Sequence, residues 1–279
     1  METALKSFLK FILLIILLSQ FNSSFMCAQT SLPETNLQKP EKEQSRYNYS
    51  PDDVNSSIKK VIEKSAQILI VTSKEWESPV AGMVYYERRN DKMIKMADTI
   101  QVNLGRSGLG WGDGLTEFNK SAGPVKREGD GRSPAGIFSL SYAFGYLPKD
   151  SLIWLDYPYE QVTAGTECVD DTASEYYNRI LDADSIVKTW KSSEIMRGYG
   201  PYYKYGIFVD HNSNPPVPGC GSCIFIHVWG GYGKPTSGCT AMAEDQIVKL
   251  LHWLSAEKKP ILIQLTENEF NKIRPVLGL

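Results

Sequence analysis

Residues 226–240 carry the strongest pattern in the sequence, Ile226-His227-Val228-Trp229-Gly230-Gly231-Tyr232-Gly233-Lys234-Pro235-Thr236-Ser237-Gly238-Cys239-Thr240. One histidine lies inside an apolar run, one cysteine lies in a Ser-Gly-Cys sequence, and a turn rich in glycine separates them. Residues 225–229 are typical of a buried strand, and residues 243–256 of a helix. The functional interpretation rests on this strand, turn and helix.

A cysteine beside a histidine predicts nucleophilic chemistry. A thiol becomes a nucleophile when it loses its proton, and a nearby imidazole can take that proton. A helix start after the cysteine would favour the thiolate further. Gly238 lets the backbone approach a substrate carbonyl, and amides near it could hold an oxyanion. The leading hypothesis is a Cys–His acyl-transfer enzyme with nucleophile Cys239, base His227 and an oxyanion loop formed by Ser237, Gly238 and Thr240.

The run from His227 to Ser-Gly-Cys resembles the catalytic motif of the L,D-transpeptidases (YkuD-type domain), which cross-link bacterial peptidoglycan. That motif has a histidine, a glycine-containing loop and then Ser/Thr-His-Gly-Cys. Residues 129–138, Gly-Asp-Gly-Arg-Ser-Pro-Ala-Gly-Ile-Phe, resemble the family's Thr-Pro-x-Gly-x-Phe segment. The resemblance covers residues 129–264 and is weaker before them.

The sequence departs from the family motif on both sides of the cysteine. Ser237 stands where the family usually has a histidine, and Ala241 stands where it usually has arginine or asparagine. The loop after His227 is also shorter than in the commonest version. The nucleophile and base therefore carry over, whereas side-chain help to the oxyanion does not.

The resemblance implies a mainly β domain, a sandwich or open barrel with a few helices packed outside. Many short strands with glycine and proline turns agree with this α+β class. It also implies a cysteine acyltransferase that acts on peptidoglycan tetrapeptide stems without a cofactor or metal. The candidate substrate-binding side chains are Arg132, Tyr232 and Lys234. Arg132 suits bidentate pairing with a carboxylate, and a solvated loop arginine is the plain alternative.

Three other functions remain open. An L,D-carboxypeptidase would resolve the same acyl-enzyme with water. A non-catalytic wall-binding module would keep the fold without the chemistry. A thiol–disulfide enzyme could use Cys220 and Cys223, although a structural bridge or two buried thiols is the plainer account of these residues. Asp170 and Asp171 could bind a substrate amine or a cation, although paired acids more often cap a helix.

Composition and the N-terminal sequence indicate the domain organisation and the cellular location of the protein. The chain has 279 residues, 42% of them hydrophobic, and a net charge of −2, so no nucleic-acid-binding field is implied. Lys6 and Lys10 precede an apolar run too short to span a membrane comfortably. We expect a signal peptide over 1–28, a flexible linker over 29–50 and a single catalytic domain over 51–279. The protein is then exported to the periplasm or cell envelope, with an uncleaved anchor or lipidation at Cys27 as alternatives.

Local patterns predict further elements. A helix is expected over 52–66 with Ser50 as its cap. Two β segments, 80–88 and 92–104, are expected to meet in a hairpin turn at Asn90-Asp91. The remaining expectations are strands over 67–72, 122–127, 136–142, 203–210 and 261–265, a glycine-rich surface loop over 105–114, and structural roles for His211 and His252.

Overall fold

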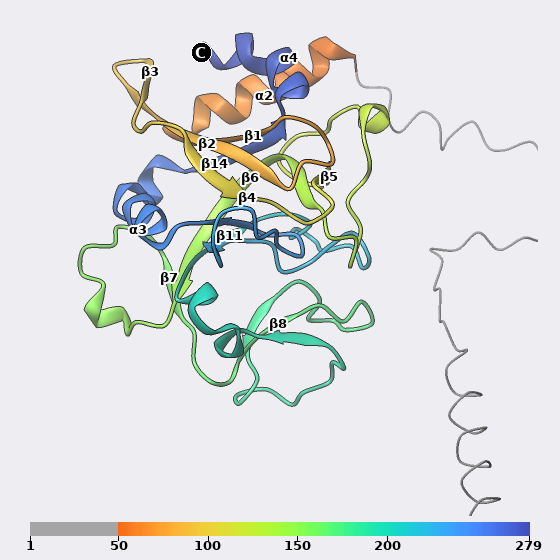
Figure 1. Cartoon of the computed structure of the whole chain (residues 1–279), viewed down its shortest axis with the longest axis vertical. Helices are drawn as coiled ribbons and strands as arrows, with labels where there is room; N and C mark the ends of the chain where they lie inside the picture. Colours follow the sequence, from red (N-terminus) through yellow and green to blue (C-terminus); the bar gives the residue numbers. More distant parts are fainter. Residues whose placement is uncertain (1–49) are drawn as a thin grey trace, which may run out of the picture. The chain divides into compact units, whose positions relative to one another are not determined.

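The computed structural model describes residues 50–279 (Figure 1). The predicted signal peptide and all but the last residue of the predicted linker lie outside this part of the chain. The described part is mainly β, with helices at the periphery of the sheet, as predicted. None of the helices within it has the length and apolar character needed to cross a bilayer.

Eight strands close into a barrel. Each is hydrogen-bonded to the next, and a pairing of the first strand with the last completes the ring. Two neighbouring pairs, β1–β14 and β12–β13, are parallel, and the other pairs are antiparallel. In order around the ring, the strands are β1 (Gln67–Ser73), β14 (Ile261–Thr266), β6 (Ser133–Gly145), β11 (Tyr205–Val209), β12 (Phe225–Val228), β13 (Thr240–Met242), β4 (Ile100–Asn103) and β2 (Val80–Arg89).

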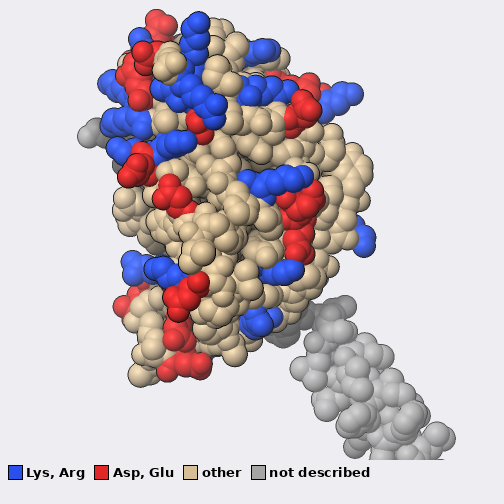
Figure 2. All heavy atoms as spheres, turned by 90° about the vertical axis from the view of Figure 1, so that its left-hand side faces the viewer, with Lys and Arg blue, Asp and Glu red and all other residues tan. Residues whose placement is uncertain are grey.

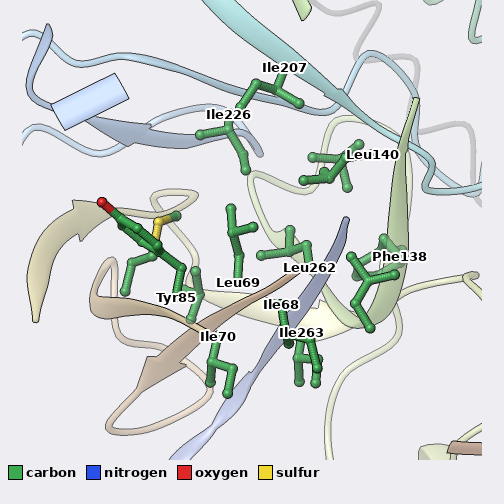
Figure 3. Packing of buried hydrophobic residues seen from close by; sticks show 14 of the residues in the cluster. Ile68, Leu69, Ile70, Tyr85, Phe138, Leu140, Ile207, Ile226, Leu262 and Ile263 are labelled. Atoms are coloured by element: carbon green, nitrogen blue, oxygen red, sulfur yellow. The ribbon is translucent and has the colours of Figure 1, made fainter. Parts of the chain in front are cut away.

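Burial patterns along the strands explain the core. β1 is almost continuously buried, whereas β2 alternates between buried and half-buried residues, with one face toward the interior. Figure 3 shows apolar side chains from several strands packed against one another, with Tyr85 at the margin. The labelled members are Ile68, Leu69, Ile70, Phe138, Leu140, Ile207, Ile226, Leu262 and Ile263.

Two helices lie side by side at one end of the domain (Figure 1). The first, α2 (Pro51–Lys64), begins at its predicted cap, since the Ser50 hydroxyl accepts the Asp53 amide at 3.2 Å. The second, α4 (Glu267–Leu277), was not expected from the sequence, and the Thr266 hydroxyl caps it. A third helix, α3 (Glu244–Trp253), buries Ile247, Leu250 and Leu251.

A small antiparallel sheet lies at the other end of the domain from α2 and α4 (Figure 1). It consists of β8 (Thr166–Val169) flanked by β9 (Ile180–Asp182) and β10 (Ser193–Ile195). A disulfide between Cys168 and Cys223 ties this sheet to the chain just before β12. The 3₁₀ segment η4 (Met196–Tyr203) leads from it back to the barrel.

The predicted hairpin is confirmed, but its second arm is shorter than expected. Asn90 and Asp91 both have positive φ, at 46° and 63°, as a type I′ turn requires. β3 (Lys92–Lys95) then pairs with one half of β2, and β4 returns to pair with the other half.

Two local predictions are wrong. Residues 122–127 form no strand, because the 3₁₀ turn η2 (Lys120–Ala122), Gly123 and Pro124 interrupt the extended run. Residues 105–114 are not a surface loop, since they contain the buried strand β5 (Leu109–Trp111), parallel to β6. A Cβ on Gly105 would lie 2.2 Å from the Gly131 carbonyl oxygen, so this glycine permits backbone packing rather than exposure.

Charged side chains of both signs are interspersed over the face in Figure 2, in keeping with the near-neutral net charge.

The remaining short elements complete the described chain. The remaining elements are β7 (Tyr159–Gln161), paired with β6, and the 3₁₀ turns η3 (Lys149–Ser151) and η5 (Ala256–Lys258).

Candidate active site

The parallel pair β12–β13 brings the predicted histidine and cysteine to one place. His227 is in register with Ala241, and Cys239 directly precedes β13. The Phe225 amide donates to the Cys239 sulfur at 3.3 Å. Side chains two positions apart on a strand share a face, so Phe225 and His227 lie on one side of β12. The Tyr203 ring contacts both in edge geometry, at centroid distances of 5.4 Å and 5.2 Å.

The tautomer of His227 follows from one hydrogen bond. Its Nδ1 lies 2.8 Å from the Val228 carbonyl oxygen. A carbonyl only accepts, so Nδ1 carries the proton and Nε2 keeps a lone pair. Burial lowers the pKa of His227 to about 4, which leaves the ring neutral near pH 7. His227 therefore has the tautomer and charge of a general base.

Cys239 rests as a protonated thiol. Its side chain is buried, and the thiol donates to the Cys223 carbonyl at 3.5 Å. Burial is the main cause that raises the pKa of the Cys239 thiol, and the negative charge of Glu194 adds to it. The Phe225 amide and the Lys126 ammonium act in the opposite direction. Thiol and imidazole are therefore both neutral near pH 7.

The helix expected over residues 243–256 is confirmed as α3, although it ends earlier, but its start is separated from Cys239 by a strand. The three residues after Cys239 form β13, which pairs with β12 and β4, and α3 begins only at Glu244. A helix macrodipole acts within about one turn of the helix end. Hence α3 does not supply the thiolate stabilisation that the sequence predicted.

Hydrogen bonds hold the Ser-Gly-Cys turn rigid. The Thr236 hydroxyl accepts the Gly238 amide at 3.1 Å and donates to the Cys239 carbonyl at 2.6 Å. The Ser133 hydroxyl donates to the same carbonyl at 3.0 Å. With the Gly238 amide engaged, the Cys239 amide is the candidate oxyanion donor of the predicted pair.

Two other members of the predicted oxyanion loop have different roles. The Thr240 hydroxyl donates to the buried Gln264 side chain at 2.7 Å, so it belongs to the core. The Ser237 hydroxyl lies 3.4 Å from the Arg106 guanidinium at an exposed position. Neither hydroxyl is therefore a candidate oxyanion donor, and the Cys239 amide stays the candidate.

The loop after His227 is held by an asparagine that the sequence analysis missed. The buried Asn103 side chain donates to the Gly231 and Lys234 carbonyls at 2.8 Å and 2.9 Å and accepts the Gly233 amide at 3.0 Å. These bonds leave the Tyr232 ring 62% exposed. Tyr232 and Lys234 are thus presented on a fixed loop, which suits contact with a large ligand.

Arg132 is partly committed to the protein. Its guanidinium donates to the Leu109 carbonyl at 2.8 Å and lies 4.0 Å from the Glu77 carboxylate. The side chain keeps 21% exposure. The predicted contact with a substrate carboxylate would have to use its remaining donors.

An acid on the small sheet, half-buried, acts electrostatically on the thiol. Glu194 accepts the Tyr203 hydroxyl at 2.6 Å, and desolvation, helped by Asp170 and Glu128, raises its pKa to about 7. Tyr199 stacks on Tyr203 at 4.8 Å. No pattern around Glu194 in the sequence marks it, because its neighbours come from distant segments.

The cysteines and acids of the small sheet correct two hypotheses. Cys223 pairs with Cys168 rather than with Cys220, which removes the basis for a Cys220–Cys223 redox pair. Asp171 caps no helix, since it accepts the amides of Ala173 and Lys191 in a turn.

The other two histidines have separate environments. His211 donates from Nε2 to the Cys220 carbonyl and accepts the Asp113 amide, a structural role as predicted. His252 stacks on Trp154 at 3.9 Å. Over residues 50–279, histidine, cysteine and acidic side chains form no group of three or more that could hold a metal ion.

Fold and site together describe a β-barrel domain with a buried cysteine and a neutral histidine on adjacent parallel strands. Residues 79–263, well over half of the chain, match the family model of the L,D-transpeptidase catalytic domain (YkuD), and the protein belongs to this family. Comparisons with curated proteins and with solved structures returned no match. The family match begins well ahead of residue 129, where the resemblance was first evident in the sequence.

Proposed function

We propose that the protein is an exported cysteine acyltransferase that acts on peptidoglycan tetrapeptide stems. Membership of a family of peptidoglycan-modifying catalytic domains supports the substrate class. The observation that carries the residue assignment is the fixed His227 tautomer on the same strand as Phe225, whose amide anchors the Cys239 thiol. A neutral imidazole with a free lone pair is what a thiol requires as its base.

The acylation step uses both groups. The Cys239 sulfur attacks the carbonyl of the diaminopimelate residue while His227 Nε2 takes the thiol proton. The Cys239 amide donates to the oxyanion of the tetrahedral intermediate. The C–N bond to the terminal D-alanine then breaks, its amine takes the proton from His227, and a thioester remains.

The second step returns the enzyme to its starting state. An acceptor amine attacks the thioester carbonyl and loses a proton to His227. A new C–N bond forms as the C–S bond breaks, and the sulfur regains the proton. If water replaces the amine, the same steps give a carboxypeptidase.

Product analysis tests this proposal. Purified protein is incubated with tetrapeptide muropeptides, and we expect cross-linked dimers and free D-alanine. Cys239→Ser should abolish both products, whereas Cys220→Ser, the matched control, should keep them. Tripeptide without dimer would replace the transferase with an L,D-carboxypeptidase. If wild type yields neither product but binds peptidoglycan, the protein is a wall-binding module instead.

Export is supported by the basic and apolar N-terminal run and by the disulfide, which is typical of oxidising compartments. Cell fractionation with N-terminal sequencing tests it. A processed or anchored chain in the envelope fraction is expected, and accumulation of the full-length chain in the cytoplasm would contradict export.

A further inference from the structure

The candidate reaction builds negative charge in a buried place. A thiolate forms first and a tetrahedral oxyanion follows, and desolvation opposes both. At rest the imidazole is neutral, and Glu194 adds negative charge near the sulfur. Ser237 and Ala241 offer no cationic side chain beside the cysteine. The stabilising charge has to come from another segment.

Lys126 places a buried ammonium against the Ser-Gly-Cys turn. Only 4% of the residue is exposed. A Cβ built on Gly238 would lie 3.9 Å from Lys126 Nζ, so the ammonium adjoins the backbone directly before Cys239. The Lys126 charge also lowers the pKa of the Cys239 thiol. A Cβ at Gly238 would also lie 3.2 Å from the Arg132 carbonyl oxygen, a tight contact.

The protein holds this ammonium in a fixed position. Lys126 Nζ donates to the Asp130 carboxylate and to the Arg127 carbonyl, both at 2.7 Å. Asp130 is itself oriented, because it accepts the Arg127 and Arg132 amides at 2.7 Å and 2.9 Å. A Cβ on Gly221 would lie 3.0 Å from Lys126 Cε, so the lysine stem packs directly against this glycine. A fixed charge needs no rearrangement when the anion forms.

We propose that Lys126 is a positioning residue of the candidate site, whose buried ammonium stabilises the Cys239 thiolate and the oxyanion that follows. It supplies from another segment the help that Ser237 and Ala241 do not give. The oxyanion part rests on the proposed acyl transfer, whereas the thiolate part concerns the sulfur alone.

The charged and titratable groups around Cys239 give the sign of the effect. Glu194, from β10, raises the thiol pKa, and Lys126 lowers it. His227 on β12 is neutral near pH 7, and burial raises the pKa of Tyr203 on η4, so neither carries charge there. Asp130 partly offsets the Lys126 charge through their ion pair. Loss of Lys126 should therefore make the thiol harder to ionise, and loss of Asp130 should make it easier.

Alkylation of Cys239 by iodoacetamide across a pH series, followed by peptide-resolved mass spectrometry, tests the proposal on the full chain without any substrate. For Lys126→Met, we expect the alkylation rate below the thiol pKa to fall about tenfold, equivalent to about one pKa unit. Lys126→Arg should restore most of the rate, and Asp130→Asn should raise it. The matched control, Lys60→Met at an exposed position on α2, should leave the profile unchanged.

The double variant Lys126→Met/Asp130→Asn guards against misfolding, because it removes the buried pair without leaving one charge unpaired. A folded double variant should show a smaller slowing of alkylation than Lys126→Met. A profile that overlays wild type in the folded double variant would overturn the proposal, as would slowing in Asp130→Asn. Since alkylation needs no turnover, a protein that makes no cross-links could still confirm the role of Lys126.

Discussion

At the scale of single residues, the site is built from neutral partners. His227 presents its lone pair because a neighbouring carbonyl holds its only proton, and Cys239 keeps its thiol proton because the site is dry. Glu194 is the third member, with a pKa raised to about 7 by burial. Burial shifts each pKa toward the uncharged form, so near pH 7 the thiol and the imidazole are neutral, whereas Glu194 is partly ionised.

Glu194 gives a pH-dependent stability prediction. Its pKa is raised from 4.5 to about 7 in the folded state, so its favourable contribution is complete below 4.5 and is lost as the pH rises through 7. Glu194→Gln stays neutral and can still accept from Tyr203. We expect this variant to be more stable than wild type by about 2 kcal/mol near pH 8, with no difference below about pH 4.5.

Urea unfolding at several pH values measures this difference. His211 and His227, whose pKa values are lowered to about 4, destabilise both proteins as the pH falls below 6.5. The comparison of variant with wild type therefore isolates Glu194. A variant that is less stable than wild type near pH 8 would show that the fold favours the ionised acid, so that the pKa of Glu194 is not raised.

Thr236 gives a second prediction at this scale, because its hydroxyl accepts the Gly238 amide and donates to the Cys239 carbonyl. Thr236→Val keeps the shape of the side chain and removes both bonds. We expect kcat to fall by about tenfold to a hundredfold, since a small misplacement of reacting groups is costly. Steady-state cross-linking kinetics measures it, and an unchanged kcat would mean that the turn is held without Thr236.

At the scale of elements, short connections position the site. Asn103, at the end of β4, binds the loop after His227 through three hydrogen bonds. Asn103→Ala should destabilise the protein by about 2–3 kcal/mol, because it removes three hydrogen bonds of about 1 kcal/mol each. It should also expose residues 230–235 to proteolysis. Limited proteolysis with mass spectrometry checks this, with Asn268→Ala on α4 as the control; equal cleavage in both variants would contradict it.

The disulfide fastens the small sheet to the site. Cys223 is bonded to Cys168, and its carbonyl accepts the Cys239 thiol. Cys168→Ser/Cys223→Ser should lower the free energy of unfolding by about 2–4 kcal/mol, because the unfolded chain gains conformational entropy when the cross-link is removed. Thermal unfolding under oxidising conditions measures this. A variant as stable as wild type would mean that the small sheet is held by its other contacts.

Elements with strong local patterns were predictable, and those decided by tertiary contacts were not. The helix after Ser50 and β1 follow from a cap and an apolar run. The Thr266…Glu269 capping pattern before α4 was present in the sequence and was overlooked. By contrast, no local pattern predicted β13, the short strand between Cys239 and α3, which forms because β12 and β4 pair with it.

The residues of the candidate site also divide into those that the sequence predicts and those that it does not. Spacing and family resemblance identified His227 and Cys239, whose positions in the chain are close. Asn103, Lys126 and Glu194 act from separate segments, and no local sequence pattern marks them. Folding alone brings these three side chains to the turn.

At the scale of the whole domain, α4, which contributes to stability, packs on a different part of the barrel from the candidate site. β12 lies four steps around the ring from β1, whereas α4 packs against β1 and β14. Ile273→Ala on α4 removes a buried side chain and should cost about 2–4 kcal/mol of stability. The alkylation rate of Cys239 in the folded variant should stay at the wild-type value. A changed rate at full folding would show that the helices influence the site.

The most direct test of the central claim is intact-protein mass spectrometry during reaction with a tetrapeptide muropeptide. We expect a covalent adduct equal to the substrate less its terminal D-alanine, mapped to Cys239 and labile to hydroxylamine, as a thioester is. The adduct should form far more slowly in His227→Gln. An adduct on Cys220, or cross-linking by Cys239→Ser at the wild-type rate, would contradict it.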